Sequence, residues 1–149
     1  MHSKRKGNIG ELRVAYELNK LGYSVFRELG DISRIDLIVQ IKDSLLKIQV
    51  KYITRKDGCY VFSTGKSGPG YRYNYRISDV DVFALYCAED DVIAWVLASD
   101  LIKEGDARVA IKLRSTLFPS RNNQFKGIRS LNDVKDFNQV FASYIETPK

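Results

Sequence analysis

The chain has 149 residues and a formal net charge of +6, which indicates a single domain and favours a polyanionic partner. Two cysteines, Cys59 and Cys87, and one histidine, His2, are too few for a disulfide framework or a Cys/His zinc site, so both cysteines are expected to be small core residues. The chain has no signal peptide and no apolar run of about 18 residues, so we expect a soluble, cytoplasmic, nucleoid-associated protein without a membrane partner.

The positive charge is concentrated in two stretches of the chain. Residues 51–77 contain six basic residues and one acidic residue, a local charge of +5. Residues 78–106 contain eight acidic residues and one basic residue, and residues 107–129 contain six basic residues and no acidic one. Such clustering is typical of a nucleic-acid footprint. At the N-terminus, Lys4, Arg5 and Lys6 form either a solvated tail or a phosphate-binding arm.

Residues 8–21 are predicted to form a helix with Asn8 as its N-cap and Gly22 at the C′ position. Helical spacing gives this segment an apolar stripe of Leu12, Ala15, Leu18 and Leu21. Glu11 lies along the edge of the stripe, where a carboxylate faces the sheet. The alternative for Glu11 is a capping box with Asn8.

Residues 23–28 are predicted to form a strand, residues 29–34 a loop, and residues 35–51 a hairpin with a tight turn at 42–43 whose second strand continues to residue 54. Alternation places Leu37 opposite Ile48 and Val39 opposite Leu46 in one buried layer. Asp36 then lies opposite Gln49 on the other face, with Lys51 one step diagonal. The alternative is a half-exposed hairpin with ordinary polar residues outside.

Residues 59–63 and 71–77 are predicted to be strands joined by a flexible loop at 64–70. That loop contains Gly-Lys-Ser, but the preceding spacing is wrong for a P-loop, so no nucleotide cofactor is expected. Arg72, Asn74 and Arg76 share one face of the second strand, which is suited to reading bases in a major groove. The alternative is that the tyrosine face of this strand packs on the core while the charges lie in water.

Residues 82–87 and 92–98 are predicted to be buried strands joined by the acidic turn 89–91, whose carboxylates cap turns rather than bind metal. A helical turn is expected at 100–104 and a strand at 109–113, and the basic loop 119–129 is a second candidate DNA contact. Residues 131–146 have a helical apolar stripe that either packs on the domain or forms a subunit interface. The stripe consists of Phe137, Val140, Phe141, Tyr144 and Ile145.

Glu11, Asp36, Gln49 and Lys51 together resemble the motif of the PD-(D/E)xK nuclease superfamily. The resemblance covers about residues 7–98 and is closest to the small homing endonucleases encoded in cyanobacterial group I introns. Ile35 replaces the proline of the motif, at a position without chemistry. Gln49 replaces the usual acid, and its neutral oxygen is a weaker ligand for a hard cation than a carboxylate.

The resemblance implies an α/β fold with a restriction-endonuclease-like core, a mixed β-sheet flanked by helices. It implies a single domain over residues 1–149, a DNA-binding β-ribbon inserted at about 55–77 and a C-terminal oligomerisation segment at about 131–149. It further implies a homo-oligomer, a dimer of dimers, that cleaves a long pseudo-palindromic duplex with Mg²⁺ or, alternatively, Mn²⁺. The alternatives are a Holliday junction resolvase and a non-catalytic DNA-binding protein on the same core.

By the same resemblance, Asp36 is the principal metal ligand, and Gln49 and the Val50 carbonyl supply further oxygens. Glu11 reaches the metal directly or through water, and Lys51 orients the nucleophile and stabilises the transition state. The residues expected to contact DNA are basic, aromatic or amide side chains in the stretches described above. They are Lys4, Arg5, Lys6, Arg55, Lys56, Lys66, Arg72, Tyr73, Asn74, Tyr75, Arg76, Arg121 and Lys126.

The two basic stretches predict that binding to duplex DNA is dominated by phosphate contacts. Each such contact should contribute about −0.9 to the slope of log affinity against log salt concentration. Fluorescence anisotropy with a labelled duplex at several salt concentrations measures the slope, and a slope near zero would contradict the prediction.

Overall fold

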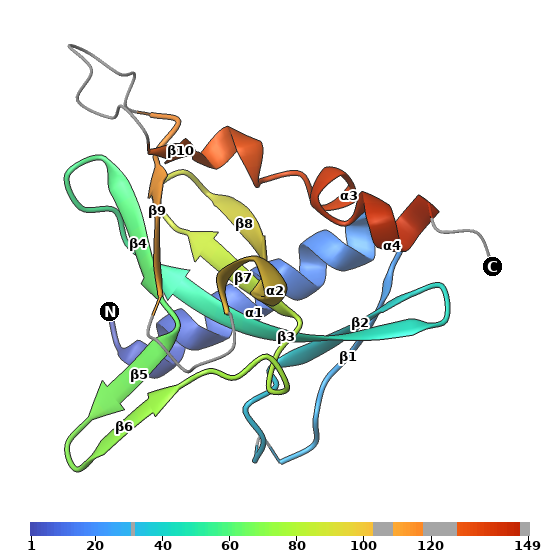
Figure 1. The fold of residues 1–149 in the computed structure, drawn as a ribbon, viewed down its shortest axis with the longest axis horizontal. Helices are drawn as coiled ribbons and strands as arrows, with labels where there is room; N and C mark the ends of the chain where they lie inside the picture. The colour runs from blue at the N-terminus through green and yellow to red at the C-terminus, as the bar shows by residue number, and fades with distance from the viewer. Residues whose placement is uncertain (31, 103–108, 118–127, 147–149) are drawn as a thin grey trace.

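The computed structural model describes residues 1–30, 32–102, 109–117 and 128–146. Its centre is a five-stranded sheet in the order β1-β2-β3-β7-β8 (Figure 1). The strands are β1 (Ser24–Phe26), β2 (Leu37–Ile41), β3 (Ser44–Ile53), β7 (Val82–Cys87) and β8 (Val92–Leu97). The β3–β7 pair is parallel and the other pairs are antiparallel, so the sheet is mixed, as predicted.

The central hairpin has the predicted register. Leu37 pairs with Ile48 and Val39 with Leu46, and all four side chains are buried in one layer. Lys42, at the turn, has a φ of 55°, the left-handed conformation that a tight hairpin turn requires. Alternation of apolar side chains therefore fixed both the buried face and the pairing.

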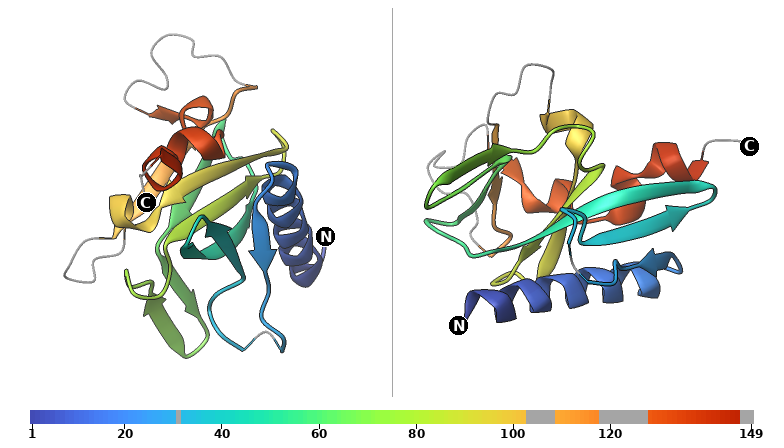
Figure 2. Two further views of the ribbon diagram at one scale, coloured as in Figure 1. Left: turned by 90° about the vertical axis from the view of Figure 1, so that its right-hand side faces the viewer. Right: turned by 90° about the horizontal axis from the view of Figure 1, so that it is seen from below.

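Helix α1 (Ser3–Lys20) covers that face of the sheet (Figure 2). The predicted start was wrong: the N-cap is His2, whose Nδ1 accepts from the Lys4 N–H, and Asn8 lies inside the helix. The helix buries Gly10, Val14 and Leu18, whereas Leu12 from the predicted stripe is 66% exposed. The end was predicted correctly, with Gly22 at a φ of 93°.

The opposite face of the sheet carries a second core under a smaller sheet, β10-β9-β4. Its strands are β4 (Cys59–Ser63), β9 (Ala110–Arg114) and β10 (Arg129–Ser130). Cys87 is buried in this core, and Cys59 on β4 is buried as well, which confirms both as small core residues. Phe62 and Phe83 pack ring to ring at 4.8 Å and join the two sheets.

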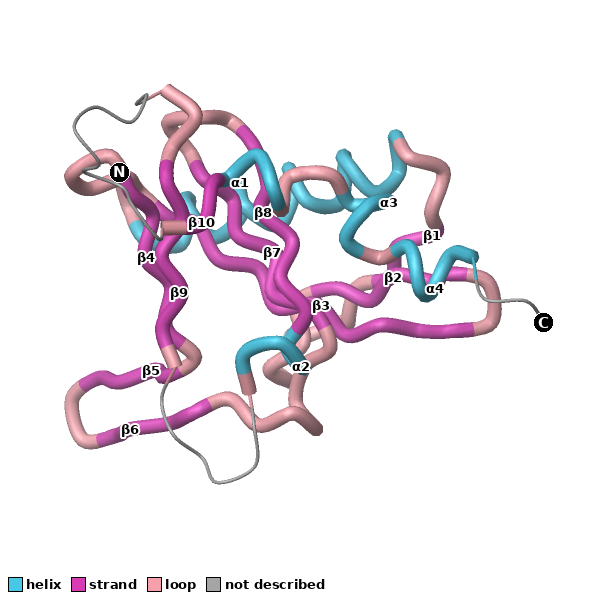
Figure 3. Tube along the Cα trace, turned by 45° about the horizontal axis from the view of Figure 1, so that its top comes forward, coloured by secondary structure: helices cyan, strands magenta, loops and turns pink. Residues whose placement is uncertain are grey.

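Strands β5 (Gly65–Gly68) and β6 (Tyr71–Asn74) form a separate two-stranded antiparallel ribbon. The prediction of a flexible loop at 64–70 was therefore wrong, since cross-strand pairing outweighs the poor strand propensity of glycine. The ribbon projects from the body of the protein on the same side as the β1–β2 connection (Figures 1 and 3).

The C-terminal part contains the 3₁₀ turn η1 (Leu131–Asp133) and the short helices α3 (Phe137–Val140) and α4 (Ala142–Glu146), and α2 (Ala98–Leu101) follows β8. Phe137 and Phe141 stack at 4.4 Å and pack against Trp95 of β8. Both phenylalanines are buried in the chain's own core, so they are not available to a subunit interface. No helix in the described ranges is long and apolar enough to span a membrane.

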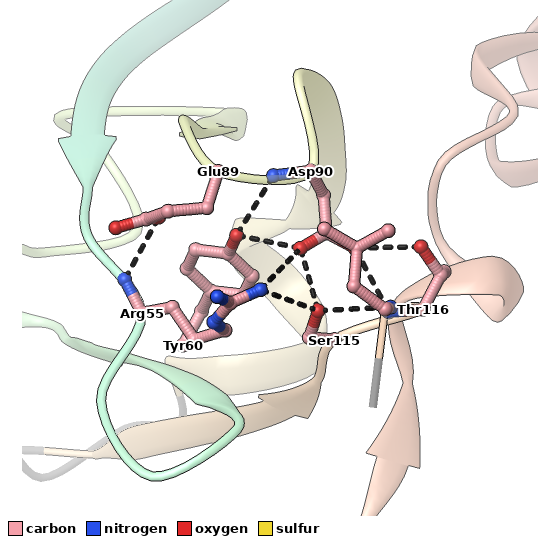
Figure 4. Close-up of polar contacts among 7 residues, drawn as sticks. Arg55, Tyr60, Glu89, Asp90, Ser115 and Thr116 are labelled. Atoms are coloured by element: carbon pink, nitrogen blue, oxygen red, sulfur yellow. Dashed lines mark hydrogen bonds and ion pairs between the residues drawn. The ribbon is translucent and has the colours of Figure 1, made fainter. Parts of the chain in front are cut away.

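The acidic β7–β8 turn joins the two sheets through Asp90, whose side chain is fully buried (Figure 4). Its carboxylate accepts from Tyr60 at 2.7 Å, Ser115 at 2.6 Å and both the N–H and hydroxyl of Thr116, and Arg55 lies 3.8 Å away. Burial alone would raise the pKa of Asp90, but these hydrogen bonds outweigh burial and lower it. As predicted, Asp90 caps the ends of turns and strands.

We predict that Asp90→Asn lowers the free energy of unfolding by about 2–3 kcal/mol, because an amide cannot accept all of these donors. Since the folded-state pKa is depressed, the carboxylate's contribution is complete above about pH 4 and is lost as the pH falls further. Urea unfolding of the wild-type protein and the variant between pH 3 and 7 should therefore show their difference shrinking in acid. Asp133→Asn, at an exposed position, is the control. A difference that does not depend on pH would contradict this account.

Candidate active site at the base of the central hairpin

Asp36 is held at the entrance to the hairpin by the backbone of β3. Its N–H donates to the Ile48 carbonyl at 3.0 Å, and its carboxylate Oδ2 accepts from the Val50 N–H at 2.8 Å. The second bond places the carboxylate against the peptide that joins Gln49 to Val50. The structure thus brings Asp36 and Gln49 together, as the sequence pattern predicted.

Gln49 is a buried polar residue on β3, with 8% of its surface exposed. Its Oε1 has no hydrogen-bond partner among the described residues. Buried acceptors in native proteins almost always have a partner, so an orphaned oxygen suggests a bound ion or water. The oxygens of Asp36 and Gln49 are the donor type that Mg²⁺ prefers, and this part of the site fits such a cation.

Lys51 extends from the same face of β3 as Gln49, two residues further along the strand. Its side chain is partly buried, and its Nζ lies 5.4 Å from the centroid of the Tyr75 ring. The lysine therefore belongs to the Gln49 face of the strand, as predicted. Val50 has its side chain on the opposite face, in the core beneath α1, so only its backbone can serve the site.

Glu11 approaches from α1 and pairs with Arg27 at 3.6 Å. It lines a pocket of about 370 Å³ between α1 and β1, and Asp36 lines a neighbouring pocket of about 310 Å³. The two pockets share Phe26, Arg27 and Leu37. Within the described ranges, no three His, Cys, Asp or Glu residues gather closely enough to hold a metal, so a place for Glu11 in the metal site remains a prediction.

Gly10 sets the distance between the helix that carries Glu11 and the strand that carries Gln49 and Lys51. A Cβ at this position would lie 3.3 Å from Val50 Cγ1 and 3.7 Å from Tyr52 Cβ. This contact could not be predicted from the sequence, because a glycine inside a helix carries no apolar signal. Arg27, the partner of Glu11, could not be predicted either, because nothing in the sequence distinguishes it from the other arginines.

The residues predicted to bind DNA occupy different environments. Tyr75 is 5% exposed, so its side chain belongs to the core, the alternative given above for the tyrosine face. Arg55 is largely engaged by Asp90 and Ser115. Lys4 and Arg5 are exposed on the first turns of α1, and Lys6 Nζ lies 5.7 Å from the centroid of the Tyr52 ring. Lys56 and Arg76 are also exposed, whereas Asn74 is partly buried. Arg121 and Lys126, with the side chains of Lys66, Arg72 and Tyr73, lie outside the described part of the structure.

This mixed sheet, with an acid entering one hairpin strand and a Gln-x-Lys motif on the other, defines a nuclease-like α/β core. The family model of the PD-(D/E)XK endonucleases matches residues 1–137. The chain therefore belongs to the PD-(D/E)XK endonuclease family.

Two solved structures are similar to this chain. The structure of a bacterial homing endonuclease, I-Ssp6803I, matches with a TM-score of 0.72 at 20% identity, covering 98% of this chain and 95% of the other. Hjc, a Holliday junction resolvase from the archaeal hyperthermophile Archaeoglobus fulgidus, matches with a TM-score of 0.48 at 15% identity, covering 71% and 83%. A search of curated proteins found no match. At 20% identity the first similarity establishes a shared fold.

We predict that Gly10→Ala lowers the stability of the fold although alanine is the better helix former. The added methyl lies 3.3 Å from Val50 Cγ1, so Val50 or the helix must shift slightly, and overpacking of a core costs about 1–3 kcal/mol. Gly7→Ala is the matched control, because a Cβ there meets nothing within 4 Å. Thermal unfolding should show Gly7→Ala at or above wild-type stability and Gly10→Ala below it. Equal stability of the two variants would contradict the close approach.

Proposed function

We propose that this protein is a Mg²⁺-dependent, site-specific DNA endonuclease that hydrolyses phosphodiester bonds in a long pseudo-palindromic duplex for intron homing. The observation that carries the proposal is the buried, orphaned Gln49 Oε1 on the strand whose Val50 N–H fixes the Asp36 carboxylate, in a chain of the PD-(D/E)XK endonuclease family. Nucleases of this family generally use divalent metal ions. Mg²⁺ is proposed here, with Mn²⁺ as a substitute, because the donors are hard oxygens.

Asp36 and Gln49 would hold the cation, with Glu11 and the Val50 carbonyl as further candidates. The cation would polarise the phosphoryl oxygen and lower the pKa of the attacking water. The Val50 N–H fixes one Asp36 oxygen, which orients the carboxylate before the substrate binds. The Lys51 ammonium would stabilise the negative charge on the phosphoryl oxygens and the leaving oxygen as the new P–O bond to water forms and the P–O bond to the leaving oxygen breaks.

Homing is favoured over other DNA cleavage by the projecting β5–β6 ribbon and by the fold shared with a homing endonuclease. The ribbon would enter a major groove and carry Arg72 to the base edges. The predicted strand 71–77 ends at Asn74, whose Oδ1 is buried, so the exposed Arg76 would meet DNA from beside the base of the ribbon. One domain holds one candidate site, whereas a double-strand break needs two cuts. A homo-oligomer with twofold symmetry, a dimer of dimers, would supply both and impose a near-palindromic target.

A non-catalytic DNA-binding protein remains the second candidate, because Gln49 stands where the motif has an acid. A neutral oxygen binds a hard cation more weakly than a carboxylate. Gln49→Glu discriminates between the two functions. On the endonuclease account, this variant binds Mg²⁺ more tightly and retains cleavage. On the non-catalytic account, neither the wild-type protein nor the variant cleaves.

We predict that Asp36→Ala lowers the single-turnover cleavage rate by at least about 10²-fold, because the only anion in the Asp36–Gln49 donor pair is lost. Affinity for DNA without metal should stay level or rise, since an acid facing phosphate has been removed. Lys51→Ala should abolish cleavage while Mg²⁺ binding, measured by calorimetry, persists. The substrate is found by cleavage of a randomised duplex library, with a four-way junction assayed in parallel.

Asp43→Ala is the control, since Asp43 lies at the exposed turn of the same hairpin. It should cleave at the wild-type rate. Wild-type cleavage by Asp36→Ala would refute the site. Preference for the four-way junction would favour a resolvase over a homing enzyme.

A further inference from the structure

The side chain that faces the candidate catalytic lysine is Tyr75, the residue that follows the β5–β6 ribbon. Lys51 Nζ lies 5.4 Å from the centroid of its ring. At that distance the negative face of an aromatic ring attracts an ammonium group. Tyr75 is 5% exposed, so its ring also excludes solvent from one side of the lysine.

The ring that faces Lys51 is itself held firmly. Tyr75 meets Phe83 edge to face, with centroids 5.5 Å apart and an interplanar angle of 76°. Phe83 is fully buried, contacts Phe62 at 4.8 Å and is the register partner of Gln49 across the β3–β7 pair. Phe83 therefore both pairs with the strand position of the candidate metal ligand and contacts the ring beside the candidate catalytic lysine.

Tyr75 also anchors the ribbon to the body of the protein. Its N–H donates to the Thr64 carbonyl at 2.8 Å, which closes the ribbon at its base. Thr64 is 1% exposed and is held by Val109, through the Thr64 N–H at 2.8 Å and the Thr64 hydroxyl at 2.9 Å. Tyr75, whose ring lies beside Lys51, is thus also the residue at which the ribbon joins the core.

We propose that Tyr75 is a positioning residue for Lys51: its ring face holds the ammonium group at the candidate site and couples the lysine's position to the base of the β5–β6 ribbon. This inference rests on the proposed function, in which Lys51 stabilises the transition state. It assigns Tyr75 a role in the rate of cleavage rather than in DNA affinity. The ring rather than the hydroxyl group supplies the attraction.

The experiment compares Tyr75→Phe, which keeps the ring, with Tyr75→Leu, which removes it. Phe62→Leu is the matched control, because it removes a ring from the same cluster without touching the lysine. Misplacement of a catalytic group by about 1 Å can cost 10²-fold in rate, so Tyr75→Leu should slow single-turnover cleavage by at least about tenfold at saturating DNA. Tyr75→Phe and Phe62→Leu should stay within about threefold of wild type, and DNA affinity should change little in all three.

The relative cleavage rates of these variants distinguish positioning of Lys51 by Tyr75 from a general loss of core packing. Loss of cleavage by Tyr75→Phe, or equal slowing by Phe62→Leu, would overturn the proposal.

A second readout needs neither cleavage nor a folded Tyr75→Leu variant. In the wild-type protein, ring currents should shift the Lys51 ε-methylene proton resonances upfield of those of other lysines, with the assignment made through Lys51→Arg. Unshifted resonances would refute the contact whatever the enzyme's activity. Shifted resonances in a protein that cleaves no DNA would instead uphold the contact and reject the proposed function.

Discussion

The site depends on one constraint, the register of the β2–β3 hairpin. Leu37 and Val39 pair with Ile48 and Leu46 because all four must be buried beneath α1. A slip of one residue would expose this layer and turn Gln49 and Lys51 toward the helix. The same register brings the Asp36 carboxylate to the Val50 N–H, so the free energy that buries the core also aligns the candidate catalytic groups.

The second face of the sheet explains how the β5–β6 ribbon is attached to the rest of the protein. The smaller sheet is fixed to the main sheet by Phe62 against Phe83 and by the buried Asp90 carboxylate with its donors from β4 and the segment after β9. The ribbon leaves the smaller sheet after β4 and returns at Tyr75. The base of the ribbon is therefore fixed to the sheet that contains β3. In the proposed function, this attachment would hold the ribbon at a set distance from the candidate active site.

Residue patterns predicted the parts of the structure whose periodicity is strong. The hairpin register, β4, β7 and the end of α1 follow from alternation or from Gly22, and the cluster of Asp36 and Gln49 follows from that register. The start of α1 escaped prediction because Ser3–Gly7 has no apolar period, and β5 because paired glycines look like a loop. Gly10 and Tyr75 act through contacts between distant segments, which local patterns do not contain. Helical spacing predicted the apolar stripe that includes Phe137 and Phe141 but left open whether it packs on the domain or forms a subunit interface. The fold shows that both phenylalanines pack on Trp95.

The central claim is that Asp36 and the orphaned oxygen of Gln49 bind one divalent cation. Anomalous scattering from a crystal of the protein grown with duplex DNA and Mn²⁺ tests it most directly. The account predicts a Mn²⁺ peak within about 2.0–2.3 Å of an Asp36 carboxylate oxygen and of Gln49 Oε1. A Mn²⁺ peak elsewhere would contradict the claim. The absence of a peak, with Gln49 Oε1 hydrogen-bonded to another protein group, would contradict it too.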